Sequence, residues 1–158
     1  AMSGEAIIYP STPFNVWGGA RDVGASALAD NGLVNVKSAH DVATTADHLE
    51  KVLNAKGMKV FARINHAAGA ASVGKQLPAT ELVIFGNPKV GAPLMQCSRS
   101  TGIDLPQKAL IWQDKQGITW LSYNDPQYLA QRHDIQGCDP VLAKVSKALS
   151  NFAAAATK

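Results

Sequence analysis

Residues 32–57 read GLVNVKSAHDVATTADHLEKVLNAKG, and regular structure begins in this stretch. Apolar and polar side chains alternate over residues 33–37, which predicts a half-buried strand. Ser38 then offers an N-cap, with Asp41 three residues later as an acidic variant of the capping box. Apolar residues follow at helical spacing up to a glycine stop. The stretch therefore predicts a strand followed by a helix over residues 39–56.

The rest of the chain alternates between short strands and helices. Further strands are predicted at residues 60–66, 81–85, 109–113 and 118–123, the last two paired across a four-residue polar turn. Helices are predicted at residues 67–73, from Pro93 onward, from Asn124-Asp125-Pro126 to about Arg132, and at 140–156 behind an Asp139-Pro140 start. These strands are too few for a doubly wound sheet. We therefore expect an α+β two-layer sandwich, with helices on one face of a mostly antiparallel sheet of about five strands.

The first 31 residues differ from the remainder of the chain, because they hold scattered apolar anchors without a sustained period. We interpret residues 1–31 as an arm packed on the domain, with one short helix near residues 23–30. Trp17 is expected to serve as a packing anchor rather than a binding residue. Residues 32–158 then form a single α+β domain.

Composition excludes several classes of protein. The 158 residues are 46% hydrophobic and 17% charged, which is typical of a globular domain and not of a disordered chain. The net charge of +3 is too small to imply nucleic-acid binding, and no basic stripe is present. No apolar run approaches the ~20 residues that span a bilayer. We expect no nucleic-acid partner and no membrane span.

Cys97 and Cys138 are the two cysteines of the chain. Both lie in small polar surroundings, which permits one disulfide in an oxidising compartment, and unlinked thiols remain the alternative. The chain opens without a basic and apolar leader, so it either never had a secretion signal or begins after one. We expect a periplasmic or secreted protein, with a cytoplasmic one as the alternative.

Three segments are more specific than composition: ELVIFGNPKVGAPLM at residues 81–95, IDLP at 103–106 and LSYNDP at 121–126. Together with the first strand and helix they resemble the bacterial family called domain of unknown function 302, from residue 32 to residue 133. The resemblance implies a small α+β domain, often dimeric, with no established activity. The chain has Asn65 where the resemblance leads us to expect an aspartate, so no role of that aspartate is carried over to this position.

A polar group of residues is expected where two loops meet at one edge of the sheet. Carboxylates beside a lysine and an amide can bind a small polar ligand or transfer protons. The candidate ligand-binding residues are His66, Glu81, Asn87, Asp104, Lys108 and Tyr123. Four of them also have a local explanation: Asn87 as a left-handed turn residue, Asp104 as a turn cap, and Glu81 with Lys108 as an ion pair.

The spacing of the histidine, cysteine and methionine residues gives less support to a functional site. His40, His48 and His133 are expected to be solvated or to cap helices, whereas His66 ends a strand and can point into a cleft. A copper site built from Met95, Cys97 and His66 is conceivable, but core packing of Met95 is the favoured interpretation. We expect no catalytic residue, metal or other cofactor.

The leading hypothesis is a non-enzymatic small-ligand-binding or accessory domain of an exported bacterial protein, active as a homodimer. The ligand, an unidentified small molecule, would lie between the turn at residues 86–88, the loop at 104–106 and the segment at His66. One alternative is a small hydrolase or isomerase that uses Glu81 or Asp104 with His66. A structural dimerisation module is the other.

Overall fold

An antiparallel sheet forms the centre of the fold. The computed structural model describes residues 26–28 and 31–158 of the chain. Within them six strands lie in the order β1-β2-β6-β5-β4-β3, and every neighbouring pair is antiparallel. The strands are β1 (Ser26–Leu28), β2 (Leu33–Ser38), β3 (Lys59–Asn65), β4 (Thr80–Gly86), β5 (Gln107–Gln113) and β6 (Thr119–Asn124). The predicted β5–β6 hairpin is present.

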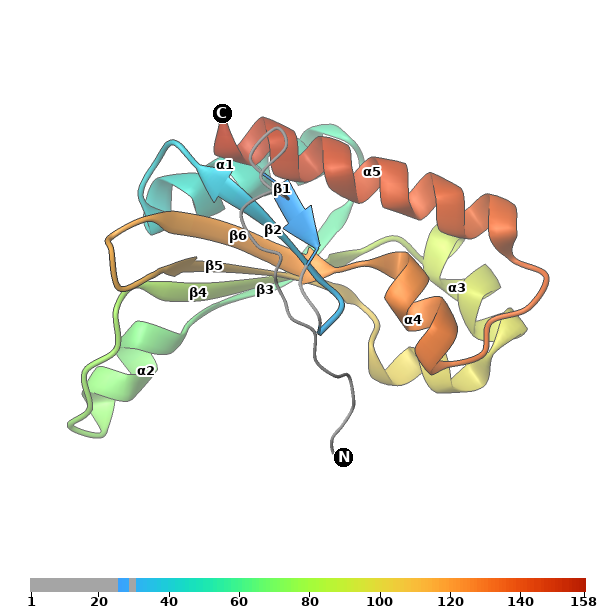
Figure 1. Cartoon of the computed structure of the whole chain (residues 1–158), viewed down its shortest axis with the longest axis horizontal. Helices are drawn as coiled ribbons and strands as arrows, with labels where there is room; N and C mark the ends of the chain where they lie inside the picture. Colours follow the sequence, from blue (N-terminus) through green and yellow to red (C-terminus); the bar gives the residue numbers. More distant parts are fainter. Residues whose placement is uncertain (1–25, 29–30) are drawn as a thin grey trace.

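Two long helices cover one face of this sheet (Figure 1). The helical segments are α1 (Val42–Ala55), α2 (His66–Ser72), α3 (Pro88–Cys97), the 3-10 helix η2 (Arg99–Ile103), α4 (Pro126–Arg132) and α5 (Asp139–Thr157). α1 and α5 lie side by side above the sheet, while α3 and α4 gather near one end of it and α2 projects from the other. The predicted α+β sandwich is confirmed.

The core lies between these two helices and the sheet. Val42, Ala46, Leu49 and Leu53 recur at helical spacing on α1 and are at most 3% exposed. They belong to the same buried cluster as alternate residues of β4, such as Val83. Burial of each large apolar side chain contributes about 1.5–3 kcal/mol. The apolar residues whose spacing predicts the helix therefore also form the face that packs against the sheet.

The opposite face of the sheet carries the residues that alternate with the core residues along each strand. It presents half-buried apolar side chains from the central strands: Leu82 and Ile84 of β4, Leu110 and Trp112 of β5, and Trp120 of β6. The indole N–H of Trp112 donates to Ser122 Oγ at 2.9 Å, and Ser122 Oγ donates to Asn35 Oδ1 at 2.5 Å. This face is therefore mixed in character, with a polar line through an apolar surface.

The starts of α1, α3 and α5 differ from prediction. α1 is capped by Asp41, whose Oδ1 accepts from the backbone N–H of Thr44 at 2.8 Å, because Ser38 is the last residue of β2. α3 begins at Pro88 rather than Pro93, because Asn87 followed by proline is already a complete start signal. α5 has Cys138 at its N-cap position, and Asp139 is its first helical residue.

The N-terminal prediction is overturned where the structure tests it. Residues 26–28, expected within a short helix at 23–30, instead form β1, which pairs antiparallel with β2. The remainder of that helix, and the proposed anchor Trp17, lie outside the described residues.

A disulfide joins Cys97, the last residue of α3, to Cys138 at the start of α5. Their Cα atoms lie 6.4 Å apart, and 41 residues separate them in the chain. Loop-closure entropy assigns a crosslink of that span about 4 kcal/mol of stabilisation, acting on the unfolded chain. The bond also removes Cys97 from any copper site, since a disulfide sulfur is not a thiolate ligand.

Candidate functional site

A cavity of about 470 Å³ lies between α3, α5 and the neighbouring ends of β3, β4 and β5. Its walls are mainly apolar. They are formed by Lys56, Met58, Phe61, Gly86, Asn87, Pro88, Val90, Gly91, Ala92, Leu94, Met95, Gly102, Leu105, Pro106, Gln107, Lys144, Val145, Ala148, Leu149 and Phe152. This volume falls within the ~300–1,000 Å³ that is typical of small-molecule sites.

One wall of the cavity is a face of α5. Lys144, Ala148 and Phe152 follow one another at intervals of four residues, so the helix stacks them along one side. Two loops form other parts of the wall: the turn into α3 at Asn87 and the cis Leu105–Pro106 segment before β5. The structure therefore brings the two predicted loops together, as expected from their strand-end positions.

The polar groups of the cavity wall are few. Asn87 Oδ1 accepts from the backbone N–H of Lys89 at 3.0 Å, and the Asn87 carbonyl accepts from the N–H groups of Val90 and Gly91. Pro88, the first helical residue, has no N–H group. The backbone N–H groups at the start of α3 are thus already paired. The charged residues on the cavity wall are Lys56 and Lys144.

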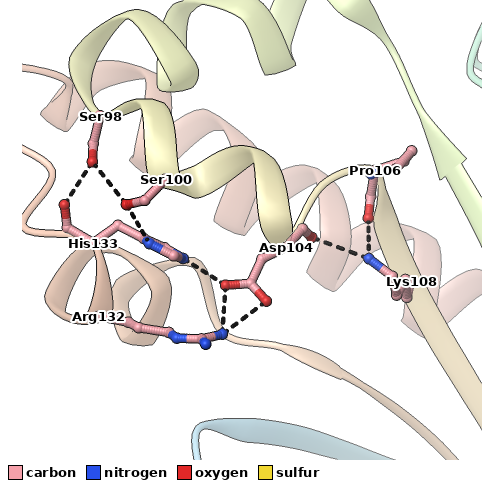
Figure 2. Close-up of polar contacts among 7 residues, drawn as sticks. All are labelled: Ser98, Ser100, Asp104, Pro106, Lys108, Arg132 and His133. Atoms are coloured by element: carbon pink, nitrogen blue, oxygen red, sulfur yellow. Dashed lines mark hydrogen bonds and ion pairs between the residues drawn. The ribbon is translucent and has the colours of Figure 1, made fainter.

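A polar cluster lies near the cavity, at the junction of η2 and α4 (Figure 2). Arg132 Nη1 donates to both carboxylate oxygens of Asp104, at 3.0 and 2.9 Å. His133 Nε2 lies 2.5 Å from Asp104 Oδ2, and His133 Nδ1 lies 2.8 Å from Ser100 Oγ. Ser98 Oγ donates to the carbonyl of His133 at 2.7 Å.

The donor directions in this cluster follow from the charge of Asp104. An ionised carboxylate only accepts, so Nε2 of His133 carries the hydrogen that faces it. On the neutral ring, Nδ1 then accepts from the hydroxyl of Ser100. Because His133 is buried and Asp104 is half-buried, the cluster fastens η2 to the end of α4. His133 was expected to be solvated or to cap a helix. It is the C-cap residue of α4, as the second of these alternatives has it, but it is buried in this network rather than solvated.

Glu81 belongs to a different network, on the face of the sheet that α1 covers. Arg63 of β3 donates from Nε to Glu81 Oε1 at 2.6 Å, and from Nη1 to Asp47 and Glu50 of α1 at 2.6 and 2.8 Å. The hydrogen bond to Glu81 is the main cause that raises the pKa of Arg63. The predicted ion pair between Glu81 and Lys108 is therefore wrong, because Arg63 takes that place.

The other predicted residues are spread over the molecule. Lys108 Nζ donates to the carbonyls of Asp104 and Pro106, at 3.3 and 2.9 Å. His66 was predicted to end a strand, but β3 ends at Asn65 and His66 is the exposed first residue of α2. Tyr123 of β6 is 7% exposed, and burial together with the charge of Asp125 raises the pKa of its phenol.

Strand geometry separates the candidates into two groups. Glu81 pairs with Asn65 at one end of β4, whereas Asn87 follows the other end. At ~3.4 Å per residue, these two positions are about 20 Å apart. The structure therefore brings Asn87 to the loop of Asp104 and Lys108, and places His66 and Glu81 away from them. Asn87 adopts an extended φ of −147° as an N-cap, not the left-handed turn that was the local explanation.

Sequence reasoning missed Arg132, His133, Lys56 and Lys144. For Lys144 a signal existed, because its four-residue spacing from Ala148 aligns it with the apolar face of α5. No group of three or more histidine, cysteine, aspartate or glutamate residues suited to a metal occurs among residues 31–158. Over the same part of the chain, no helix combines the length and apolar character needed to cross a membrane.

Comparison with known proteins gives a family, a set of partial relatives and a fold neighbour. Residues 34–152 match the family described as Domain of unknown function DUF302. The chain is 49% identical over 110 residues to proteins named Fluoride-specific ion channel FluC 1 of Brucella suis and of Brucella abortus. The aligned part is 70% of this chain but 43% and 41% of those proteins, so the chain spans about two fifths of their length.

The fold neighbour is a crystal structure of an uncharacterized conserved DUF302 protein from Bacillus stearothermophilus. It superimposes with a TM-score of 0.72 at 18% identity, over 80% of this chain and 98% of that one. At this identity the match supports a shared fold.

Proposed function

The chain belongs to the DUF302 family, and we propose that it is a non-enzymatic domain that binds a small apolar ligand in the cavity between α3 and α5. The cavity is the observation that carries this proposal. Its walls come from α3, α5 and the ends of β3, β4 and β5, which are packed elements of the fold, so the space is held open before a ligand arrives.

The chemistry of the walls favours binding over catalysis. The titratable side chains on the cavity wall are those of Lys56 and Lys144, and the described wall includes no carboxylate or imidazole to pair with them as acid and base. Asp104 is close to the cavity but is already engaged by Arg132 and His133. The alternative, a hydrolase or isomerase that uses a carboxylate with His66, lacks a comparable supporting contact.

The experiment is a titration with 1-dodecanol, a neutral single-chain probe, followed by native mass spectrometry and thermal unfolding. Ala148→Phe fills the cavity from α5 and is expected to abolish binding. Ala143→Phe makes the same change at an exposed position of the same helix and is expected to leave binding intact. Binding to Ala148→Phe equal to that of the unmodified protein would refute the proposal.

An exported location is proposed with this function. The Cys97–Cys138 disulfide supports it, since such bonds persist in oxidising compartments and are rare in the cytosol. Acid-quenched cells treated with a maleimide tag provide the test. We expect both thiols to be protected from the tag until reduction, and tagging of both without reduction would contradict an exported location.

A homodimer through the sheet face opposite α1 and α5 is the corresponding proposal for assembly. Ile64, on the edge strand β3, is 39% exposed on that face, next to half-buried Leu82 and Leu110. Apolar residues on a sheet edge favour pairing with a second chain. Sedimentation velocity is expected to show a dimer that Ile64→Lys converts to monomer; a monomer at all concentrations would refute the proposal.

An accessory role beside a membrane channel is a second candidate, favoured by the 49% identity to part of proteins named as fluoride channels. The test measures fluoride efflux from vesicles that hold such a channel without its matching region. Addition of this chain is expected to change the efflux rate at least twofold, and an unchanged rate would refute this role.

A further inference from the structure

Positive charge collects around the cavity. Lys56, at the C-terminal end of α1, and Lys144, on α5, both line it. The ammonium of Lys59 lies 5.3 Å from the centroid of the Phe61 ring, which forms another part of the wall. The cavity therefore combines an apolar interior with cationic groups supplied from three separate elements.

These lysines differ from Arg63 and Arg132 in what they contact. Both of those arginines are held by carboxylates. Over residues 31–158, no carboxylate lies within ion-pairing distance of Lys56, Lys59 or Lys144. All three residues are exposed, and Lys56 and Lys144 belong to the cavity wall. Long lysine side chains can lie along apolar surface while the charged end stays in water.

The start of α3 is the other position where an anion could bind, but its geometry does not favour binding there. Its first amide positions are occupied by Pro88, which has no N–H, and by N–H groups that already donate to Asn87. An anionic group at this cavity therefore finds its charged donors on the lysine side chains.

We propose that the ligand is a single-chain amphiphile with an anionic headgroup, of the fatty-acid class. Its hydrocarbon chain lies in the apolar cavity and its carboxylate meets Lys56 and Lys144. The inference rests on the proposed function, because it assigns the chemistry of the ligand in that same cavity. A volume near the lower end of the usual range for small-molecule sites fits one chain of medium length better than a two-chain lipid.

The test compares three probes of equal chain length below their micellar concentrations: dodecanoate, 1-dodecanol and dodecyltrimethylammonium. Dodecanoate is expected to bind about tenfold more tightly than 1-dodecanol, since two partly exposed ion pairs each contribute a few-fold. The cationic probe is expected to bind most weakly. Raising the salt concentration should reduce the advantage of dodecanoate, because solvent-exposed charges are screened.

Matched charge reversals test whether Lys56 and Lys144 are the residues that bind the carboxylate. Lys56→Glu with Lys144→Glu is expected to remove the preference for dodecanoate while 1-dodecanol still binds. Lys51→Glu with Lys147→Glu makes the same change of net charge on the same two helices, at exposed positions outside the cavity wall. This control pair is expected to keep the preference.

The outcomes separate the two proposals. Equal binding of dodecanoate and 1-dodecanol, both blocked by Ala148→Phe, overturns the anionic headgroup and leaves the apolar cavity as the ligand site. Tighter binding of the cationic probe, or a preference unaffected by reversal of Lys56 and Lys144, also overturns it. If no probe binds, both proposals fall.

Discussion

Asp104 and His133 lie 29 residues apart in the chain, and the imidazole Nε2 is 2.5 Å from the carboxylate oxygen Oδ2. The same carboxylate receives two hydrogen bonds from Arg132. This contact fixes η2 against α4 beside the cavity, so it supports the loop that leads to Leu105 and Pro106. The site is thus built from an apolar cavity and a polar network that holds one of its walls.

Asp104→Ala is expected to lower the free energy of unfolding by about 2–4 kcal/mol, because it leaves a buried imidazole without its charged partner. Urea unfolding measures the change. Ser100→Ala removes a hydroxyl from the exposed end of the network and is expected to cost less than about 1 kcal/mol. Equal stability of Asp104→Ala and the unmodified protein would contradict the structural role of the cluster.

Arg63→Ala is expected to destabilise the protein by a similar amount, about 2–4 kcal/mol, since Glu81 then remains buried without a cation. The double variant Arg63→Ala with Glu81→Leu is expected to be more stable than the sum of the two single changes predicts. A double-mutant cycle of urea midpoints measures this coupling. Strict additivity would show that the two side chains do not interact in solution.

Reduction of the Cys97–Cys138 bond is expected to lower the unfolding free energy by up to about 4 kcal/mol. Urea unfolding with and without a phosphine reductant provides the comparison. The double serine variant is the control, because its midpoint should not respond to the reductant. A midpoint unchanged by reduction of the unmodified protein would argue against the bond.

Acid is expected to weaken the β5–β6 hairpin through Asp114. Its carboxylate accepts from the Trp120 indole N–H at 2.8 Å and from the backbone N–H groups of Gln116 and Ile118. The bond to Trp120 is the largest cause that lowers the pKa of Asp114 below 3.8. The associated stability is therefore present above pH 3.8 and is lost as the pH falls through the lowered value.

Asp114→Asn should remove that part of the acid dependence. Trp120 fluorescence during urea unfolding, at neutral pH and below pH 3.8, is the measurement. Asp47→Asn, on α1, is the control and should retain the dependence due to Asp114. Identical acid dependence of Asp114→Asn and the unmodified protein would refute the assignment.

The sequence predicts the elements better than their contacts. Alternation and helical spacing identify α1, β4 and the β5–β6 hairpin, because each pattern is local. The predicted start of α3 is wrong because two prolines carry the same signal, and the earlier one, after Asn87, is preceded by a cap. Residues 26–28 lack a sustained period, so their pairing with β2 depends on a strand already in place.

The candidate site was predictable only in part. The positions of Asn87 and Asp104 at strand ends correctly indicated that their loops meet. The pairing of Asp104 with His133 has no local pattern, since it depends on how η2 packs against α4. The contact of Arg63 with Glu81 likewise depends on the pairing of β3 with β4, which are 18 residues apart at these positions. The cavity itself is left between side chains from elements distant in sequence, so periodicity does not reveal its volume.

Methionine methyl NMR tests the central claim most directly. Met58 and Met95 both line the cavity, from the approach to β3 and from α3. With carbon-13-labelled methionine, titration with dodecanoate is predicted to shift both methyl resonances along one saturating curve, and Ala148→Phe is predicted to abolish the shifts. Saturable binding that leaves the Met58 and Met95 resonances unmoved would contradict a ligand in this cavity.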